Sequence, residues 1–242
     1  MGNVFDEMGL YWAEIADADY TERQIVFLKN HLPAGCCVLD VACGSGRHTI
    51  ALASSGFEVV GLDVSLRLLR IAKQRGADML VRGDMRYLPF KSAAFKAVVS
   101  MDTSFGYLLS EAEDAQSLAD IRRVLKPEGE LFIDVFNRER LVAKYRGRSA
   151  SPRSLEYPSF RLEQKRSVSE DGAWLNDVWI VNDSVSMQVR VFEHKVRLYK
   201  HAQLESLLFE AGLFIKSVLG DYDGQQFNLD SPRQIIIACV CP

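Results

Sequence analysis

The sequence predicts an α/β fold in which a doubly wound, mostly parallel seven-stranded sheet carries an inserted antiparallel β meander. Up to residue 136, short apolar runs rich in β-branched residues alternate with segments that repeat apolar residues at helical spacing. Such alternation is typical of βαβ units and a parallel sheet. Beyond residue 136 the chain changes to strand-like segments joined by turn residues, and helical spacing returns near residue 203.

The composition fits one sizeable core. The chain has 242 residues, of which 48% are apolar and 25% charged, so we expect one domain with an insertion. A net charge of -3 argues against a general nucleic-acid-binding surface. The N-terminus lacks the features of a signal peptide, and no apolar run reaches the roughly 18 residues of a membrane helix. We therefore expect a cytoplasmic protein without a membrane partner.

The cysteines predict neither a disulfide nor a metal centre. They are odd in number and lack paired Cys-x-x-Cys spacing, which favours buried, strand-associated thiols in a reducing compartment. The positions are Cys36, Cys37, Cys43, Cys239 and Cys241. We predict no bound metal.

The expected elements of the first part follow in chain order. Thr21 and Gln24 form a capping-box pattern that opens a helix, which ends before the turn at residues 33–35. Further helices are expected at residues 49–54, 65–75 and 111–125. The parallel strands are expected at residues 36–41, 57–62, 79–81, 95–100 and 130–136, with a turn at 126–129 before the last of them.

Residues 137–198 are expected to form an insertion in this sheet. Its first part, 138–153, is basic, and Asp171-Gly172 is a strong hairpin signal within the rest. Strand character is found at residues 160–169, 173–181 and 186–198. The core would comprise residues 1–136 and 199–242, completed by a helix at 203–211 and strands at 213–219 and 234–240.

The stretch VLDVACGSGRH, residues 38–48, is where we expect a binding site. A strand ending in Asp40 leads into a turn with Gly44 and Gly46, and a helix follows. Glycine lets a ligand approach the backbone, and a helix start presents unpaired N–H groups. A dinucleotide fingerprint would require glycine at position 49, where Thr49 stands.

Three aspartates limit which kinds of ligand the site could bind. Asp40, Asp63 and Asp84 lie at the ends of three successive expected strands. The carboxyl ends of neighbouring parallel strands share one crevice, so these side chains would face a single ligand. A ligand with a positive centre, ribose hydroxyls and an exocyclic amine would suit them. Any one of them alone is more simply a helix cap or turn residue.

Four successive motifs resemble those of the class I S-adenosylmethionine-dependent methyltransferases: VLDVACGSGRH, GLDVS, GDMRYLPF and LKPEGELFIDV. The resemblance covers residues 5–136 and the closing strands at 213–240. It implies a Rossmann-like sheet that binds S-adenosylmethionine. The stretch GDYDGQQFNLDSPRQIIIA also resembles the terminal hairpin of bacterial members with an inserted antiparallel sheet, including some amino-sugar N-methyltransferases.

The resemblance implies roles for individual residues. Asp40 would lie near the methionine part of the cofactor, Asp63 at the ribose hydroxyls, and Asp84 with Met85 at the adenine. Tyr11 resembles a tyrosine that closes over the cofactor or the acceptor. The implied cofactor contacts are Tyr11, Asp40, Ala42, Gly44, Gly46, His48, Asp63, Val64, Asp84, Met85 and Met101.

The acceptor side is predicted from residue types. Methyl transfer needs a base only when the acceptor is a hydroxyl or a protonated amine. Candidate catalytic residues are Asp102, Tyr107 and His194, with core packing or solvent exposure as the alternatives. The expected acceptor pocket consists of Tyr11, Phe105, Arg197, Tyr199 and Tyr222. We expect the meander to be its lid, in which Trp174 and Trp179 stack the acceptor or instead pack in a lid core or a dimer interface.

Three functions stay open. The leading one is in-line methyl transfer to a nitrogen or oxygen of a small-molecule acceptor. The second is RNA modification through the basic segment 138–153. The chain lacks the Asn/Asp-Pro-Pro-aromatic motif that usually follows the strand ending at residue 100 in methyltransferases of adenine and cytosine, so nucleic acid is disfavoured. The third is a regulatory protein that binds S-adenosylmethionine without turnover. Both a monomer and a homodimer are compatible with the sequence.

Overall fold

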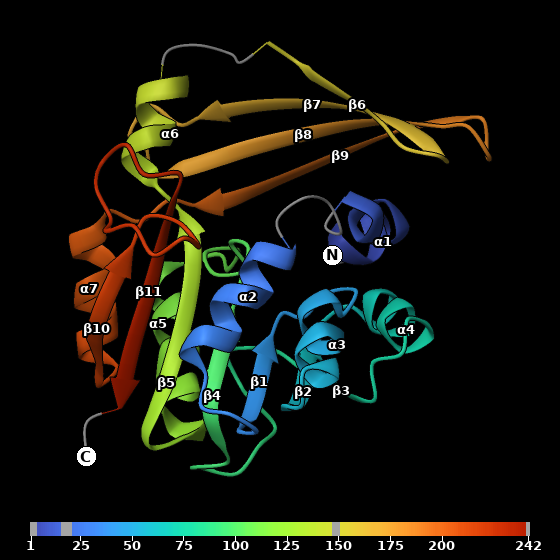
Figure 1. The fold of residues 1–242 in the computed structure, drawn as a ribbon. Coiled ribbons are helices and arrows are strands. Elements are labelled where there is room, and N and C mark those ends of the chain that lie inside the picture. The colour runs from blue at the N-terminus through green and yellow to red at the C-terminus, as the bar shows by residue number, and fades with distance from the viewer. Residues whose placement is uncertain (1–3, 16–20, 147–150, 241–242) are drawn as a thin grey trace.

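A computed structural model describes residues 4–15, 21–146 and 151–240 of the chain. Within these ranges the strands of the central sheet lie in the order β10-β11-β5-β4-β1-β2-β3 (Figure 1). The parallel part pairs β1 through β5, and β11 is antiparallel to both β5 and β10. The predicted doubly wound, mostly parallel sheet of seven strands is confirmed. Their bounds are β1 (Cys37–Val41), β2 (Glu58–Asp63), β3 (Met79–Arg82), β4 (Phe95–Ser100), β5 (Leu125–Phe136), β10 (Leu213–Leu219) and β11 (Arg233–Val240).

Helices cover both faces of the central sheet because its strands bury alternate residues on opposite sides. Leu39 of β1 packs in a cluster with α5 and α7, whereas its neighbour Val38 packs in a second cluster with α2 and α3. The helices are α1 (Val4–Ile15), α2 (Thr21–His31), α3 (Arg47–Ser54), α4 (Leu66–Gln74), α5 (Glu111–Val124), α6 (Arg138–Tyr145) and α7 (His201–Glu210).

The second sheet is antiparallel and lies over the end of the central sheet toward which β1 points (Figure 1). Among the described residues it contains β6 (Arg153–Glu156), β7 (Phe160–Val168), β8 (Trp174–Asp183) and β9 (Gln188–Arg197), in that order. The meander is therefore confirmed, with β6 as an additional edge strand. β6 was not predicted, because RSLE between two prolines has little strand character and becomes extended by pairing with β7.

Two local predictions were wrong. Residues 126–129 were expected as a turn outside the strand, but β5 already begins at Leu125, which pairs with Phe95, and the irregularity at Glu128 (φ 55°) lies inside the strand. The side chain of Gln24 does not cap α2. It is fully buried and makes hydrogen bonds to residues of other elements.

The first helix joins the second sheet to the rest of the molecule. Met8 and Tyr11 of α1 pack in one buried cluster with Phe160, Trp179 and other side chains of the second sheet. The same helix contacts α4, so it lies between that sheet and the central sheet (Figure 1). Consequently α1 forms one wall of the space beneath the meander.

Two arginines of the basic segment 138–153 form hydrogen bonds with backbone carbonyls of other segments. Arg138 donates hydrogen bonds to the backbone carbonyls of Asp171 and Gly172, and Arg140 donates to the carbonyl of Asp230. Arg148 lies outside the described residues, as does Cys241. Across the described ranges, no helix has both the length and the apolar character needed to cross a membrane.

Candidate functional site

The glycine turn joins β1 to α3 in a left-handed backbone conformation. Ala42, Gly44 and Gly46 have φ values of 57°, 57° and 80°. A Cβ built on Gly44 would meet no described atom within 4 Å, whereas one on Gly46 would come within 2.9 Å of the Ala72 Cβ. Gly44 therefore leaves room for a ligand, and Gly46 allows α3 to pack against α4.

Two buried carboxylates support this turn. Asp63 accepts hydrogen bonds from the backbone N–H of Gly44 and of Ser65, both at 2.8 Å, and Asp40 accepts one from the Thr49 hydroxyl at 2.7 Å. Burial raises the pKa of Asp40 to about 6 and also raises the pKa of Asp63. Ligand groups that donate hydrogen bonds or carry positive charge would stabilise such carboxylates.

A cavity of about 430 Å³ opens beside the turn. It lies at the carboxyl ends of the parallel strands, where open α/β sheets bind their ligands. Of the predicted cofactor contacts, the cavity is lined by Ala42, Gly44, Asp63, Val64, Asp84 and Met85. The remaining ones, Tyr11, Asp40, Gly46, His48 and Met101, do not line it.

Asp84 reaches the cavity with its carboxylate already paired. The guanidinium of Arg86 donates to both carboxylate oxygens, with Nη2 2.6 Å from Oδ2, and this lowers the pKa of Asp84. Arg86 also pairs with Glu113 of α5. This ion pair fixes the loop after β3 and was not predicted.

Tyr11 takes part in the packing of α1 against the second sheet. Its hydroxyl donates to Asp183 Oδ2 at 2.5 Å, and its ring contacts those of Phe160 and Phe192. In this structure its side chain is therefore directed away from the cavity. Met101 is likewise 2% exposed and belongs to the core beneath the sheet.

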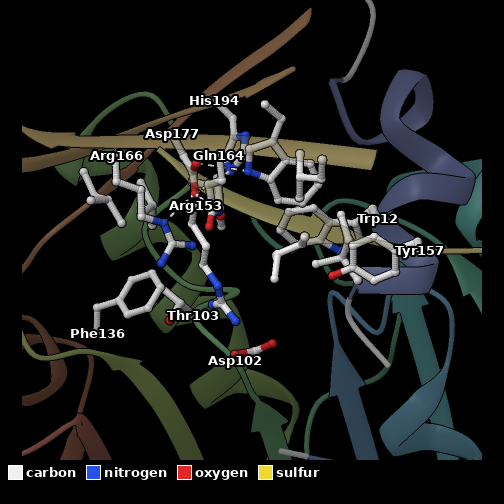
Figure 2. Close-up of a pocket in the computed structure, with 17 residues that line it drawn as sticks. Trp12, Asp102, Thr103, Phe136, Arg153, Tyr157, Gln164, Arg166, Asp177 and His194 are labelled. Carbon is white, nitrogen blue, oxygen red and sulfur yellow. Dashed lines mark hydrogen bonds and ion pairs between the residues drawn. The ribbon is translucent and has the colours of Figure 1, made fainter. Parts of the chain in front are cut away.

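A second cavity, of about 350 Å³, lies beneath the meander (Figure 2). Trp12, Asp102, Thr103 and Tyr107 line both cavities. Figure 2 shows Asp102 and Thr103 below this space and His194, Asp177 and Gln164 of the second sheet above it. The two cavities therefore meet at the loop that follows β4.

A buried carboxylate forms the roof of the second cavity. Asp177, 3% exposed, accepts hydrogen bonds at Oδ2 from Gln164 and from Arg166 Nε, both at 2.8 Å. Its Oδ1 accepts one from Trp179 Nε1 at 3.0 Å. Both oxygens of Asp177 are thus satisfied by neighbouring side chains.

His194 lies next to this carboxylate with one ring nitrogen free. Its Nε2 is 3.9 Å from Asp177 Oδ2, and its buried Nδ1 has no hydrogen-bond partner among the described residues. The rings of Trp12, Tyr107 and Trp179 surround it. His194 lines the second cavity, and burial lowers its pKa, so the imidazole is neutral at neutral pH.

The loop between the cavities is held in a strained conformation. Asp102 and Thr103 have φ values of 54° and 63°, which non-glycine residues rarely adopt. Asp134 Oδ2 accepts the N–H of Asp102 at 2.9 Å, Arg233 donates to the Thr103 hydroxyl at 2.6 Å, and Arg47 donates to Asp102 Oδ2 at 2.8 Å. These contacts fix the loop where the two cavities join.

The same contacts extend behind the glycine turn. Tyr222 donates to Asp134 Oδ2 at 2.6 Å, and Gln24 Nε2 donates to the Tyr222 hydroxyl at 2.8 Å. The Gln24 carbonyl oxygen lies within hydrogen-bond distance of Arg47 and of His48. Sequence reasoning missed Gln24, Arg47, Asp134 and Arg233. For Asp134 the available signal was a charged residue within an apolar strand, LFIDVF. Gln24 and Arg47 lie in helices and carried no such signal.

Comparisons with known proteins agree with this geometry. A family model described as a methyltransferase domain matches residues 38–129, which include the glycine turn and every strand end that lines the first cavity. The predicted resemblance to the class I S-adenosylmethionine-dependent methyltransferases is therefore confirmed over this part of the chain.

Relatives and solved structures match nearly the whole chain. YqeM of Bacillus subtilis is 26% identical over 96% of this chain and 92% of that protein. The cypemycin N-terminal methyltransferase of a Streptomyces species is 27% identical over 88% of this chain and 87% of that protein. CcbJ of Streptomyces caelestis superposes with a TM-score of 0.83, at 18% identity over 98% of this chain and 96% of that one. CalS10 of Micromonospora echinaspora, an amino pentose methyltransferase solved with S-adenosylmethionine bound, has a TM-score of 0.70 at 20% identity over 96% of each chain.

The first cavity fits the cofactor of these methyltransferases. It offers the open face of Gly44 and the buried carboxylate of Asp63, with apolar Val64 and Met85 along the same wall. The buried carboxylates suit the ammonium and hydroxyl donors of S-adenosylmethionine. Among the described residues, no group of three potential ligands is arranged to hold a metal ion.

The residues predicted to form the acceptor pocket lie outside the second cavity. Phe105 is 1% exposed and packs against Tyr199, whose hydroxyl donates to buried Asp114. The guanidinium of Arg197 lies over the Trp174 ring and 3.4 Å from Asp114. Arg197 follows Val196, which lines the second cavity, and neighbouring strand residues point to opposite faces. Phe105 and Tyr199 lie outside the strands and are buried in the core. None of the predicted set, Tyr11, Phe105, Arg197, Tyr199 and Tyr222, lines the second cavity.

The candidate catalytic residues are brought together. Asp102, Tyr107 and His194 all line the second cavity, and the first two also line the cofactor cavity. Of the two lid tryptophans named from the sequence, Trp179 lines the second cavity and Trp174 does not. Trp12 of α1, which stacks on Trp179 with ring centroids 5.2 Å apart, was not predicted.

Proposed function

We propose that the protein transfers a methyl group from S-adenosylmethionine to a nitrogen or oxygen atom of a small-molecule acceptor held beneath the meander. The observation that carries this proposal is the shared wall of Trp12, Asp102, Thr103 and Tyr107, which joins the cofactor cavity to a second, partly aromatic cavity. A nitrogen acceptor is favoured, because the names of two relatives refer to an N-terminal methyltransferase and an amino pentose methyltransferase.

The glycine turn and the strand ends would hold the cofactor. Asp63 is positioned to accept hydrogen bonds from ribose hydroxyls, and the backbone at Ala42 and Gly44 would contact the methionine part. Val64 and Met85 would contact the adenine. Bound there, S-adenosylmethionine supplies a methyl group that its sulfonium already activates.

The chain contributes alignment, exclusion of water and a proton acceptor. The fixed loop at Asp102 and Thr103 would orient the acceptor toward the cofactor cavity. The meander and Trp12 would keep water away. Nδ1 of His194 would accept the proton of a protonated amine or a hydroxyl, and Tyr107 would contact the acceptor beside it.

The proposal is tested with labelled cofactor and a pool of small metabolites. We expect label in a low-molecular-weight product, with formation lost in a His194→Asn variant that still binds S-adenosylhomocysteine. Binding of S-adenosylhomocysteine without any transfer to small molecules would contradict the proposal and favour a regulatory protein.

A further inference from the structure

We propose, on the basis of the methyl transfer proposed above, that the acceptor carries an anionic group, a carboxylate or a phosphate, and that Arg153 of the lid binds it. Arg153 lies at the start of β6 and lines the second cavity. Figure 2 shows its side chain extending from the lid toward Asp102 and Thr103. An anion on its guanidinium would therefore lie near the junction with the cofactor cavity.

The other charges that line this cavity are paired. Asp102 forms an ion pair with Arg47 at 2.8 Å. Asp177 accepts hydrogen bonds from Arg166, Gln164 and Trp179. Neither carboxylate needs a cation from the ligand.

Arg153 is the exception. Its guanidinium has no hydrogen-bond or ion-pair partner among the described residues, although it lines a cavity of about 350 Å³. Arg166 contacts Asp177 through Nε alone, and its two terminal nitrogens have no partner in the described part of the chain. One wall of the cavity thus presents unpaired guanidinium donors, and an anionic ligand would complete their hydrogen bonds.

The chemistry of guanidinium limits the ligand. Its planar, forked donors match the oxygens of carboxylate and phosphate, which they bind with two parallel hydrogen bonds. The opposite side of the cavity is formed by the rings of Trp12, Tyr157 and Trp179. The expected acceptor is therefore a small molecule with an anionic end at Arg153 and an apolar part against these rings.

Anion binding is tested on the full chain saturated with S-adenosylhomocysteine. Inorganic phosphate and acetate are titrated separately at constant ionic strength, and tryptophan fluorescence is recorded, since two of the three tryptophans line the cavity. We expect a saturable change with at least one anion. Arg153→Gln should raise its Kd at least about tenfold. Arg153→Lys keeps the charge but loses the forked pair of donors, so its Kd should fall between those of the wild type and Arg153→Gln.

The control is Arg161→Gln, which removes an exposed arginine of the same sheet that pairs with Glu156 outside the cavity. It should bind the anion as the wild type does. No saturable response, or an unchanged Kd in Arg153→Gln, would overturn the inference while leaving cofactor binding intact. Failure of the wild type to bind S-adenosylhomocysteine would instead defeat the proposed function.

Analysis of the methylated product shows whether the anionic group of the acceptor is a phosphate or a carboxylate. Labelled product from the metabolite pool is passed over a strong anion exchanger at a pH of about 11, above the pKa of an alkylamine, so that a protonated amine does not neutralise the anionic group. Retention is expected, and its loss after phosphatase treatment identifies a phosphate, whereas continued retention identifies a carboxylate. Product that passes unretained would overturn the inference.

Discussion

Asp40 is a carboxylate held where water scarcely reaches it. It is 1% exposed, and its one hydrogen bond from a side chain comes from Thr49. It does not line the cofactor cavity, so its contact with the methionine part of the cofactor stays a prediction. Its position instead suggests that it fixes the start of α3 beside the glycine turn.

The raised pKa of Asp40 gives a pH-dependent stability. Because the folded pKa of about 6 exceeds the ordinary value of 3.8, the contribution of Asp40 to stability is largely present at pH 4 and is lost as pH rises through 6. Asp40→Asn should therefore gain about 2 kcal/mol relative to the wild type between pH 4 and pH 7. Urea unfolding at both pH values measures this difference. Asp78→Asn, at an exposed carboxylate, is the control, and an Asp40→Asn difference that does not change with pH would contradict the argument.

His194 gives a second pH dependence, in activity. Burial holds its pKa below 6.5, so we expect methyl transfer to fall as pH drops through that lower pKa, where Nδ1 becomes protonated. The acidic limb of kcat/KM should disappear in His194→Asn, together with most of the rate. An acidic limb that persists unchanged in this variant would assign the titration to another group.

At this scale, the sequence predicts residues whose position follows from the end of a strand. Asp63 and Gly44 were expected at one ligand site and both line the first cavity, because strand ends in a parallel sheet converge. Their contact with the cofactor stays a prediction. Gln24 and Arg233 were missed, since they come from distant parts of the chain and meet only after the tertiary fold forms.

At the scale of elements, β5 and β11 share a buried ion pair beneath the loop that follows β4. Asp134 is fully buried, and its Oδ1 accepts a hydrogen bond from Arg233 Nε at 2.7 Å. Its other oxygen accepts from Tyr222 and from the N–H of Asp102. The pair therefore links two neighbouring strands to the loop at the junction of the cavities.

Removing the arginine from this ion pair should lower the free energy of unfolding. Arg233→Met leaves the Asp134 carboxylate buried without its charged partner, and we expect a loss of about 3–5 kcal/mol in the free energy of unfolding. The double variant Arg233→Met with Asp134→Leu should recover part of the stability but not the activity, because Asp102 and Thr103 lose their supports. Urea unfolding and a methyl-transfer assay measure both effects. A stable, fully active Arg233→Met would contradict this role.

The elements themselves were largely predictable because their apolar periodicity is strong. The exceptions have physical causes. β6 has no apolar pattern of its own and depends on its pairing with β7. Residues 126–129 form an irregularity within β5, between the paired residues Leu125 and Glu130, where a turn before the strand was expected. Burial alternates with side-chain direction along β9: Phe192 and Val196 are buried, whereas Val189 and Val191 are exposed.

At the scale of the whole molecule, the fold brings two sheets together around two connected cavities. α1 fills the space between the sheets and contributes Trp12 to both cavities (Figure 1). The acceptor pocket could not be predicted from sequence because its walls come from α1, the loop after β4 and the meander together. How these three parts meet is a property of the tertiary fold alone.

The molecule should not bind RNA through its basic segment. The net charge is -3, and Arg138 and Arg140 are engaged with backbone carbonyls. We expect weak RNA retention in filter binding, unchanged in a variant with Arg146→Glu and Arg148→Glu. An RNA affinity that falls steeply with salt in the wild type and is lost in this variant would support RNA modification instead.

The most direct test of the account is calorimetric titration of S-adenosylhomocysteine into the wild type, Asp63→Ala and Asp78→Ala. We expect one site with a Kd on the order of micromolar in the wild type and in Asp78→Ala, and a Kd at least about tenfold higher in Asp63→Ala. Circular dichroism shows whether Asp63→Ala stays folded. Undetectable binding to the wild type, or equal binding to folded Asp63→Ala, would contradict the assignment of the cofactor site.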